Sequence, residues 1–249
     1  LGGPDGPVLV ELREQPGVSP PPRAGRLGLY HFAVLLPDRA TLGRLARHFS
    51  ALGVPHAASD HAVSEALYLS DPDGLGIEVY ADRPRAEWPT RGEELAMTTA
   101  PLDMGSLLDA AGAEPWSGAP AGTTLGHVHL HVGDMAAAAR FYHEALGLDT
   151  VVWSYPGALF LSAGGYHHHL GLNTWAGPRA RAAPDGEARL LEWGLVLPAA
   201  DDVEATAESL RSAGVTVEPV SAGVVVVADP WGTRLRLSAA DGDGTAGGD

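Results

Sequence analysis

The chain contains no cysteine among its 249 residues. This absence excludes a disulfide framework, a thiolate metal site and a cysteine nucleophile. Histidine and carboxylate side chains are then the plausible metal ligands, and the sequence has 11 histidines. We take a cytoplasmic location as the default, although a protein without cysteine is compatible with any compartment.

Basic residues are also scarce, with 16 Lys and Arg against 31 Asp and Glu and a net charge of −15. The basic residues are scattered, which argues against nucleic acid or an anionic membrane surface as a partner. No apolar run reaches the roughly 18 residues of a transmembrane helix. The hydrophobic share of 45% supports a full core, and the length suits one large domain or two ordinary ones.

A strand–helix–three-strand unit, βαβββ, recurs along the sequence. Its first copy has a strand at 29–36, a helix at 42–52 that buries one apolar stripe, and strands near 54–57, 62–70 and 75–81. Further copies begin at 126–134 and 190–198. Asp-Pro-X-Gly turns at 71–74 and 229–232 occupy equivalent places in the first and third copies. The sequence therefore predicts an α+β protein built from repeated βαβββ modules.

The repeats suggest where domains begin and end. We expect an N-terminal domain at 1–90, a Pro- and Gly-rich linker at 91–122, a C-terminal domain at 123–238 and a disordered tail at 239–249. Residues 8–12 read as a strand with nothing before it. The opening module therefore looks incomplete, and the sequence looks truncated by about one module.

The stretch 60–80 is the most informative part of the chain. Its last strand places Glu78 between Ile77 and Val79, and an unpaired buried carboxylate is costly. The strand at 29–36 carries an imidazole, His31. Two such residues on one sheet can share a metal ion. The competing interpretations are a core histidine bound to the backbone and an edge-strand glutamate that faces solvent.

Four phrases together carry a resemblance to a known family. They are Gly-Leu-Tyr-His-Phe-Ala-Val at 28–34, Asp-His-Ala-Val-Ser-Glu-Ala-Leu-Tyr at 60–68, Asp-Pro-Asp-Gly-Leu-Gly-Ile-Glu-Val-Tyr at 71–80, and Gly-Tyr-His-His-His-Leu-Gly-Leu-Asn at 165–173. Over nearly its whole length the sequence resembles the vicinal oxygen chelate superfamily of glyoxalases, bleomycin-resistance proteins and extradiol dioxygenases. Within it, the likeness is greatest to two-domain catechol 2,3-dioxygenase-like proteins.

The resemblance implies paired βαβββ modules that curl into two similar half-barrel domains. It implies Fe(II), held by two histidines and one glutamate, with His31 and Glu78 matching two of the ligands. The remaining histidine is expected on a strand that this sequence lacks. His61 and Tyr68 match the family's acid/base groups, and the competing interpretations are a loop histidine and a core tyrosine.

The C-terminal half departs from the family pattern. Arg236 stands where a final glutamate ligand would be, so we expect no family-type metal site there. His127, His129 and His131 alternate along one strand, but no carboxylate in that half completes a site. The run at 167–169 is expected to be structural or to lie between the domains.

The sequence therefore predicts a non-haem Fe(II) extradiol dioxygenase that acts on a catechol-type aromatic with O2, with neither nucleic acid nor membrane as partner. A homo-oligomer is compatible with it. Two alternatives stay open. One is a glyoxalase-like isomerase or lyase that uses Mn, Ni or Zn. The other is a non-catalytic protein that binds an aromatic or drug-like ligand in the same fold.

Overall fold

The structure is a computed structural model that describes residues 1–2, 8–22 and 24–240. The expected tail at 239–249 therefore lies almost entirely outside the described residues. The first repeated unit consists of β1 (Arg26–Leu35), α1 (Arg39–Leu52), β2 (Ala57–Asp60), β3 (Ser64–Ser70) and β4 (Gly76–Asp82). The second consists of β8 (Thr124–His131), α3 (Met135–Ala139), its π-helical continuation η2 (Arg140–Ala145), β9 (Asp149–Val152), β10 (Ala158–Ser162) and β11 (Leu170–Asn173). The third consists of β13 (Trp193–Leu197), α4 (Ala200–Ser212), β14 (Val217–Ser221), β15 (Val224–Ala228) and β16 (Arg234–Ala239).

The connections between these units hold short elements of their own. They are η1 (Arg85–Glu87), β5 (Thr90–Arg91), β6 (Glu94–Leu95), β7 (Ala100–Pro101), α2 (Met104–Ala110) and β12 (Arg181–Ala182). The three βαβββ copies and the α+β class predicted from the sequence are thus confirmed. The strand expected at 8–12 is wrong: these residues form no strand, and the amides of Leu9 and Val10 bond only to the carbonyl of Leu1.

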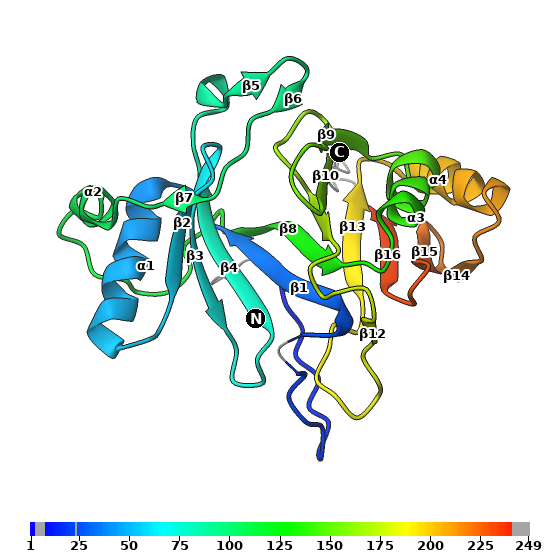
Figure 1. Ribbon diagram of the computed structural model, residues 1–249, viewed down its shortest axis with the longest axis horizontal. Coiled ribbons are helices and arrows are strands. Elements are labelled where there is room, and N and C mark those ends of the chain that lie inside the picture. The colour runs from blue at the N-terminus through cyan, green and yellow to red at the C-terminus, as the bar shows by residue number, and fades with distance from the viewer. Residues whose placement is uncertain (3–7, 23, 241–249) are drawn as a thin grey trace, which may run out of the picture.

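The first two units build one curled sheet. Its strand order is β7-β2-β3-β4-β1-β8-β11-β10-β9, with β12 pairing β1 off this path. The join is the antiparallel pairing of β1 with β8, which cross the centre of Figure 1 side by side. The third unit forms a separate four-stranded sheet, β13-β16-β15-β14. The division into domains at 91–122 stays a prediction, but backbone pairing does unite strands from both sides of that connection.

Helix α1 shows how local sequence sets these elements. The Asp38 carboxylate accepts a hydrogen bond from the amide of Thr41 and caps the helix, and Gly53 ends it at φ 66°. Leu42 and Leu45 pack into the core of the first unit. The sequence places Leu42, Leu45, Phe49 and Leu52 on one buried stripe. This prediction is wrong at its end, because Leu52 lies in the last turn with 65% of its surface exposed.

The second and third units share the largest apolar core. Tyr142 of η2, Trp193 of β13 and Leu210 of α4 belong to this one cluster, and Figure 1 shows α3 and α4 side by side. The Tyr142 hydroxyl donates to the buried Asp229 carboxylate, which opens the second Asp-Pro-X-Gly turn. No helix among the described residues is both long and apolar enough to span a membrane.

Several histidines lie in the interior around β8 and β11. Burial lowers the pKa of His129 and of His168 well below the ordinary value, and neighbouring imidazoles lower both further. Burial also lowers the pKa of His131 and of His169. These side chains are stable in the fold as neutral imidazoles, because a charged imidazole would lose its hydration there.

We therefore predict that metal-free protein loses stability as the pH falls below about 6.5, the ordinary histidine pKa. The folded-state pKa values are lowered, so the unfolded chain binds more protons in this window. Each pKa unit of difference costs about 1.4 kcal/mol. Urea unfolding followed by tryptophan fluorescence should give a lower midpoint at about pH 5.5 than at about pH 7.5.

The matched control is His168→Gln beside His143→Gln, which changes an exposed histidine. The first substitution should flatten the pH dependence, and the second should leave it as in the wild type. An unchanged urea midpoint across this range would contradict the prediction.

Candidate metal centre

Three ligand-type side chains converge where β4, β1 and β8 lie side by side. In the sheet register Ala33 of β1 is paired with Glu78 of β4 on one side and with His127 of β8 on the other. Paired residues share a face of the sheet, and so does His31, two residues before Ala33. The small Ala33 side chain is fully buried and leaves the space above it to the longer neighbours.

The three side chains meet at one carboxylate oxygen. Oε2 of Glu78 lies 3.0 Å from Nε2 of His31 and 3.1 Å from Nε2 of His127. One ligand atom from each residue lies within 4.8 Å of the other two. All three residues are buried, Glu78 with only 2% of its surface exposed. Such a carboxylate needs a partner, because its burial without one is costly.

The charges of the group suit a cation. Burial acts to raise the pKa of Glu78, but His127 and His31 outweigh it and hold that pKa well below its usual range. Burial lowers the pKa of His127 to about 4 against the opposing pull of Glu78. At neutral pH the site therefore offers an ionised carboxylate and, at His127, a neutral imidazole, which are the protonation states that bind metal.

One buried nitrogen of the group is also free to bind an ion. Within the described part of the chain, Nε2 of His31 is buried without a hydrogen-bond partner, although it lies close to the carboxylate. Two imidazoles and one carboxylate are a donor set that suits Fe(II) and also Mn, Ni or Zn. The residues present therefore fit a divalent metal ion.

Tyr68 and His61 lie beside this group. Tyr68 of β3 is paired with Glu78 in the sheet, and its ring lies 5.5 Å from the His31 ring between centroids. Its hydroxyl is 2.7 Å from Nε2 of His61. Burial and the nearby Glu78 raise the pKa of Tyr68 well above its ordinary value, so the phenol keeps its proton.

A cavity of about 1310 Å³ reaches the same place. His31 and Tyr68 line it, together with Tyr30, the turn at 71–74 and residues 231–234 of the third unit. The metal-ligand candidate His31 and the phenol of Tyr68 are therefore open to a small molecule from one side.

The sequence brought His31, Glu78, His61 and Tyr68 together as candidates, and the structure places all four in one region. It adds His127, which the sequence analysis left without a metal role because its own half of the chain supplies no carboxylate. The pairing of β1 with β8 supplies Glu78 instead. The alternation of His127, His129 and His131 was the available signal, but the partner strand was not evident from it.

The neighbouring histidines have other partners. His129 and His131 both contact the side-chain amide of Asn173, at 3.0 and 2.6 Å. His167 contacts the Asp82 carboxylate at 2.8 Å. In the third unit, Nε of Arg236 lies 2.6 Å from the Glu192 carboxylate. Among the described residues, only the group formed by His31, Glu78 and His127 has metal-site geometry.

Comparisons with known proteins agree with this architecture. Residues 124–237 match the family model "Glyoxalase/Bleomycin resistance protein/Dioxygenase superfamily". The chain is 48% identical over 218 residues to the catechol-2,3-dioxygenase of Bacillus subtilis (strain 168), a match that covers 85% of this chain and 75% of that protein.

A solved structure of a putative dioxygenase from Bacillus subtilis subsp. subtilis str. 168 shares the fold. Its TM-score is 0.56 at 14% sequence identity, and the match covers 87% of this chain. This chain spans 62% of the length of that structure. With a 48% identical homologue named catechol-2,3-dioxygenase and a curled sheet of paired βαβββ units, the chain belongs to the glyoxalase/bleomycin resistance protein/dioxygenase superfamily.

Proposed function

We propose that the protein is a non-haem Fe(II) extradiol dioxygenase that cleaves the ring of a catechol-type aromatic with O2. The observation that carries the proposal is the buried group of His31, Glu78 and His127, of which His31 lines a cavity. Two histidines and one carboxylate on one side of a metal leave further positions free for ligands. The 48% identity to a catechol-2,3-dioxygenase supports the same activity.

In this proposal His31, His127 and Glu78 hold the metal ion. When bound, ferrous iron supplies the redox chemistry that allows a catechol to react with O2. The protein fixes the ligand geometry through three adjacent strands, β4, β1 and β8, instead of through loops. The surrounding apolar and aromatic side chains keep bulk water away from one face of the group.

His61 and Tyr68 move protons. Nδ1 of His61 lies 2.6 Å from the carbonyl oxygen of Thr98, which can only accept, so Nδ1 carries the hydrogen. Nε2 then has a free lone pair and accepts a hydrogen bond from the Tyr68 hydroxyl. A substrate proton can pass to His61 through Tyr68, and the phenol can donate to a substrate oxygen.

Another metal-dependent reaction of the same superfamily is the second candidate. It rests on the donor set, because imidazole and carboxylate ligands also suit Mn, Ni and Zn. A glyoxalase-like isomerase or lyase would use one of these ions and would consume no O2. The metal retained after purification separates the two candidates.

We predict that His31→Ala, His127→Ala and Glu78→Ala each abolish stoichiometric retention of iron. Each substitution removes one of three ligands, and removing a ligand from such a site lowers affinity by far more than the roughly 10- to 100-fold loss caused by changing a ligand's supporting hydrogen bond. The measurement is iron content by elemental analysis after anaerobic loading and desalting, with circular dichroism to verify the fold.

His143→Ala is the control, since this histidine is exposed and bonds only to the carbonyl of Leu148. Full iron in all three variants would refute the metal site. Loss of iron in His31→Ala and Glu78→Ala but not in His127→Ala would show that the third ligand comes from a residue other than His127.

We predict that protein loaded with Fe(II) in the absence of air consumes O2 and catechol in equal amounts and forms a ring-opened product. His61→Ala and Tyr68→Phe should lower kcat by about 10²- to 10⁴-fold with unchanged iron content, because they remove proton transfer and leave the ligands intact. Oxygen uptake and product absorbance provide the measurement.

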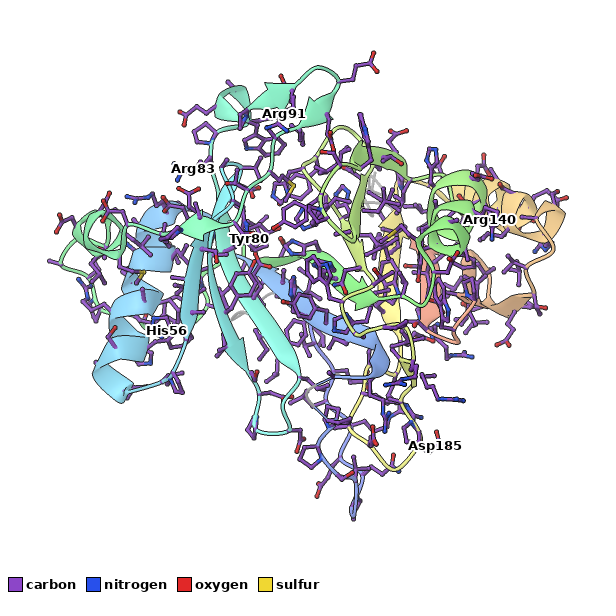
Figure 2. All side chains as sticks on the ribbon, in the orientation of Figure 1. His56, Tyr80, Arg83, Arg91, Arg140 and Asp185 are labelled. Carbon is purple, nitrogen blue, oxygen red and sulfur yellow. The ribbon has the colours of Figure 1, made fainter. Side chains whose placement is uncertain are left out.

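His56→Ala is the matched histidine control, because His56 lies beside α1, away from β1 and β8 (Figure 2), and bonds to the carbonyl of Val54. The control should keep wild-type kcat. Iron-loaded protein that takes up no O2 with catechol would exclude the dioxygenase and favour the isomerase or the binding protein.

A further inference from the structure

The turn that carries His61 has an unusual backbone. Ala62 has φ 66°, and among the described residues it is the single non-glycine with a positive φ; all the others are glycines. L residues avoid this region because Cβ crowds the backbone there, so the surrounding structure must hold Ala62 in place. Strain of this kind gathers at functional sites, and here it directly follows the proposed acid/base histidine.

Asp60 holds the turn from one side. Its Oδ1 accepts a hydrogen bond from the amide of Ala62 at 2.8 Å, and its Oδ2 lies 2.7 Å from Nη2 of Arg83. The same Nη2 donates to the buried Glu65 at 2.9 Å. Arg83 lies just past the end of β4 (Figure 2), so it ties the β2–β3 turn to the neighbouring strand.

Thr98 holds the turn from the other side. Besides accepting the hydrogen of His61 Nδ1, it donates its amide to the His61 carbonyl at 3.3 Å, and its hydroxyl donates to the Asp60 carbonyl at 3.3 Å. Thr98 lies between β6 and β7, a segment outside the repeated units. Backbone and imidazole of His61 are thus both fixed by the same residue.

We propose that Asp60, Ala62 and Arg83 are positioning residues that hold the backbone at His61 so that its imidazole keeps its bonds to Thr98 and Tyr68. The proposal rests on the proposed function, since it concerns how the acid/base imidazole is held against Tyr68. An ordinary hairpin turn would have no need of a strained alanine where glycine serves at every other described positive φ. With its Cβ, Ala62 has fewer accessible conformations than glycine, so the turn stays rigid.

The experiment compares Asp60→Ala, Asp60→Asn and Ala62→Gly in iron-loaded protein. Asp60→Ala removes the acceptor of the Ala62 amide, and we expect kcat to fall about tenfold or more with little change in KM or iron content, because a misplaced acid/base group slows the chemical step. Asp60→Asn keeps an acceptor oxygen and should restore most of kcat. Ala62→Gly should raise Tm by relieving strain and yet lower kcat severalfold.

Asp134→Ala is the matched control, because Asp134 caps α3 through the amide of Ala137 in the second unit, on the other side of the molecule from β2 and β3 (Figure 1). It should lower Tm without a change in kcat. If the turn at His61 had only a structural role, its variants would likewise change Tm without changing kcat. A fall in kcat together with a raised Tm in Ala62→Gly therefore distinguishes a positioning role from a structural one.

Nitrogen NMR of the His61 ring in the metal-free protein gives a readout independent of turnover. The wild type should show one tautomer, protonated at Nδ1, and Asp60→Ala should show averaged ring-nitrogen signals. Wild-type kcat and a fixed tautomer in Asp60→Ala would overturn the positioning proposal alone. Absence of ring cleavage by the wild type would overturn the proposed function, while the tautomer measurement would still test how His61 is held.

Discussion

The buried carboxylate of Glu78 sets the requirements that the surrounding structure meets. Its oxygen lies among nonpolar strands and contacts two imidazole nitrogens at 3.0 and 3.1 Å. Burial without those partners would be costly. One partner, His31, comes from the neighbouring strand of the same unit, but the other, His127, comes from the next unit. The pairing of β1 with β8 therefore both joins the two units into one sheet and supplies the second partner of the carboxylate.

Small residues in the sheet make space for the side chains that meet at Glu78 and for the histidines beside them. Ala33 lies between Glu78 and His127 in the register, and a larger side chain there would fill the space in which the ligands meet. Gly171 plays the same part for His129, because a Cβ at this position would lie 2.8 Å from the imidazole ring. Small residues on β1 and β11 thus make the space that the large imidazole side chains of the neighbouring strand β8 fill.

The sequence predicted the elements better than their pairing. Local signals predict the helix that ends at Leu52 and the Asp-Pro-X-Gly turns, because caps and turns depend on adjacent residues, although the helix begins at Arg39, before the predicted start at Leu42. The convergence of His31 and Glu78 also follows from strands of one unit. The role of His127 did not, since strand pairing between units depends on long-range packing that leaves no local mark. The exposure of Leu52 has the same origin, because periodicity does not show where a neighbour ends.

Two different kinds of rigidity meet at the site. The candidate ligands are held by sheet register, in which a one-residue slip would turn every ligand to the opposite face. The His61–Tyr68 pair depends instead on a hairpin turn, one arginine and a carbonyl from a connecting segment. Members of one fold can keep the first arrangement and change the second, because loops and turns vary without disturbing the sheet. In the proposed function the candidate ligands therefore select the metal ion, and the residues around His61 set the proton transfer.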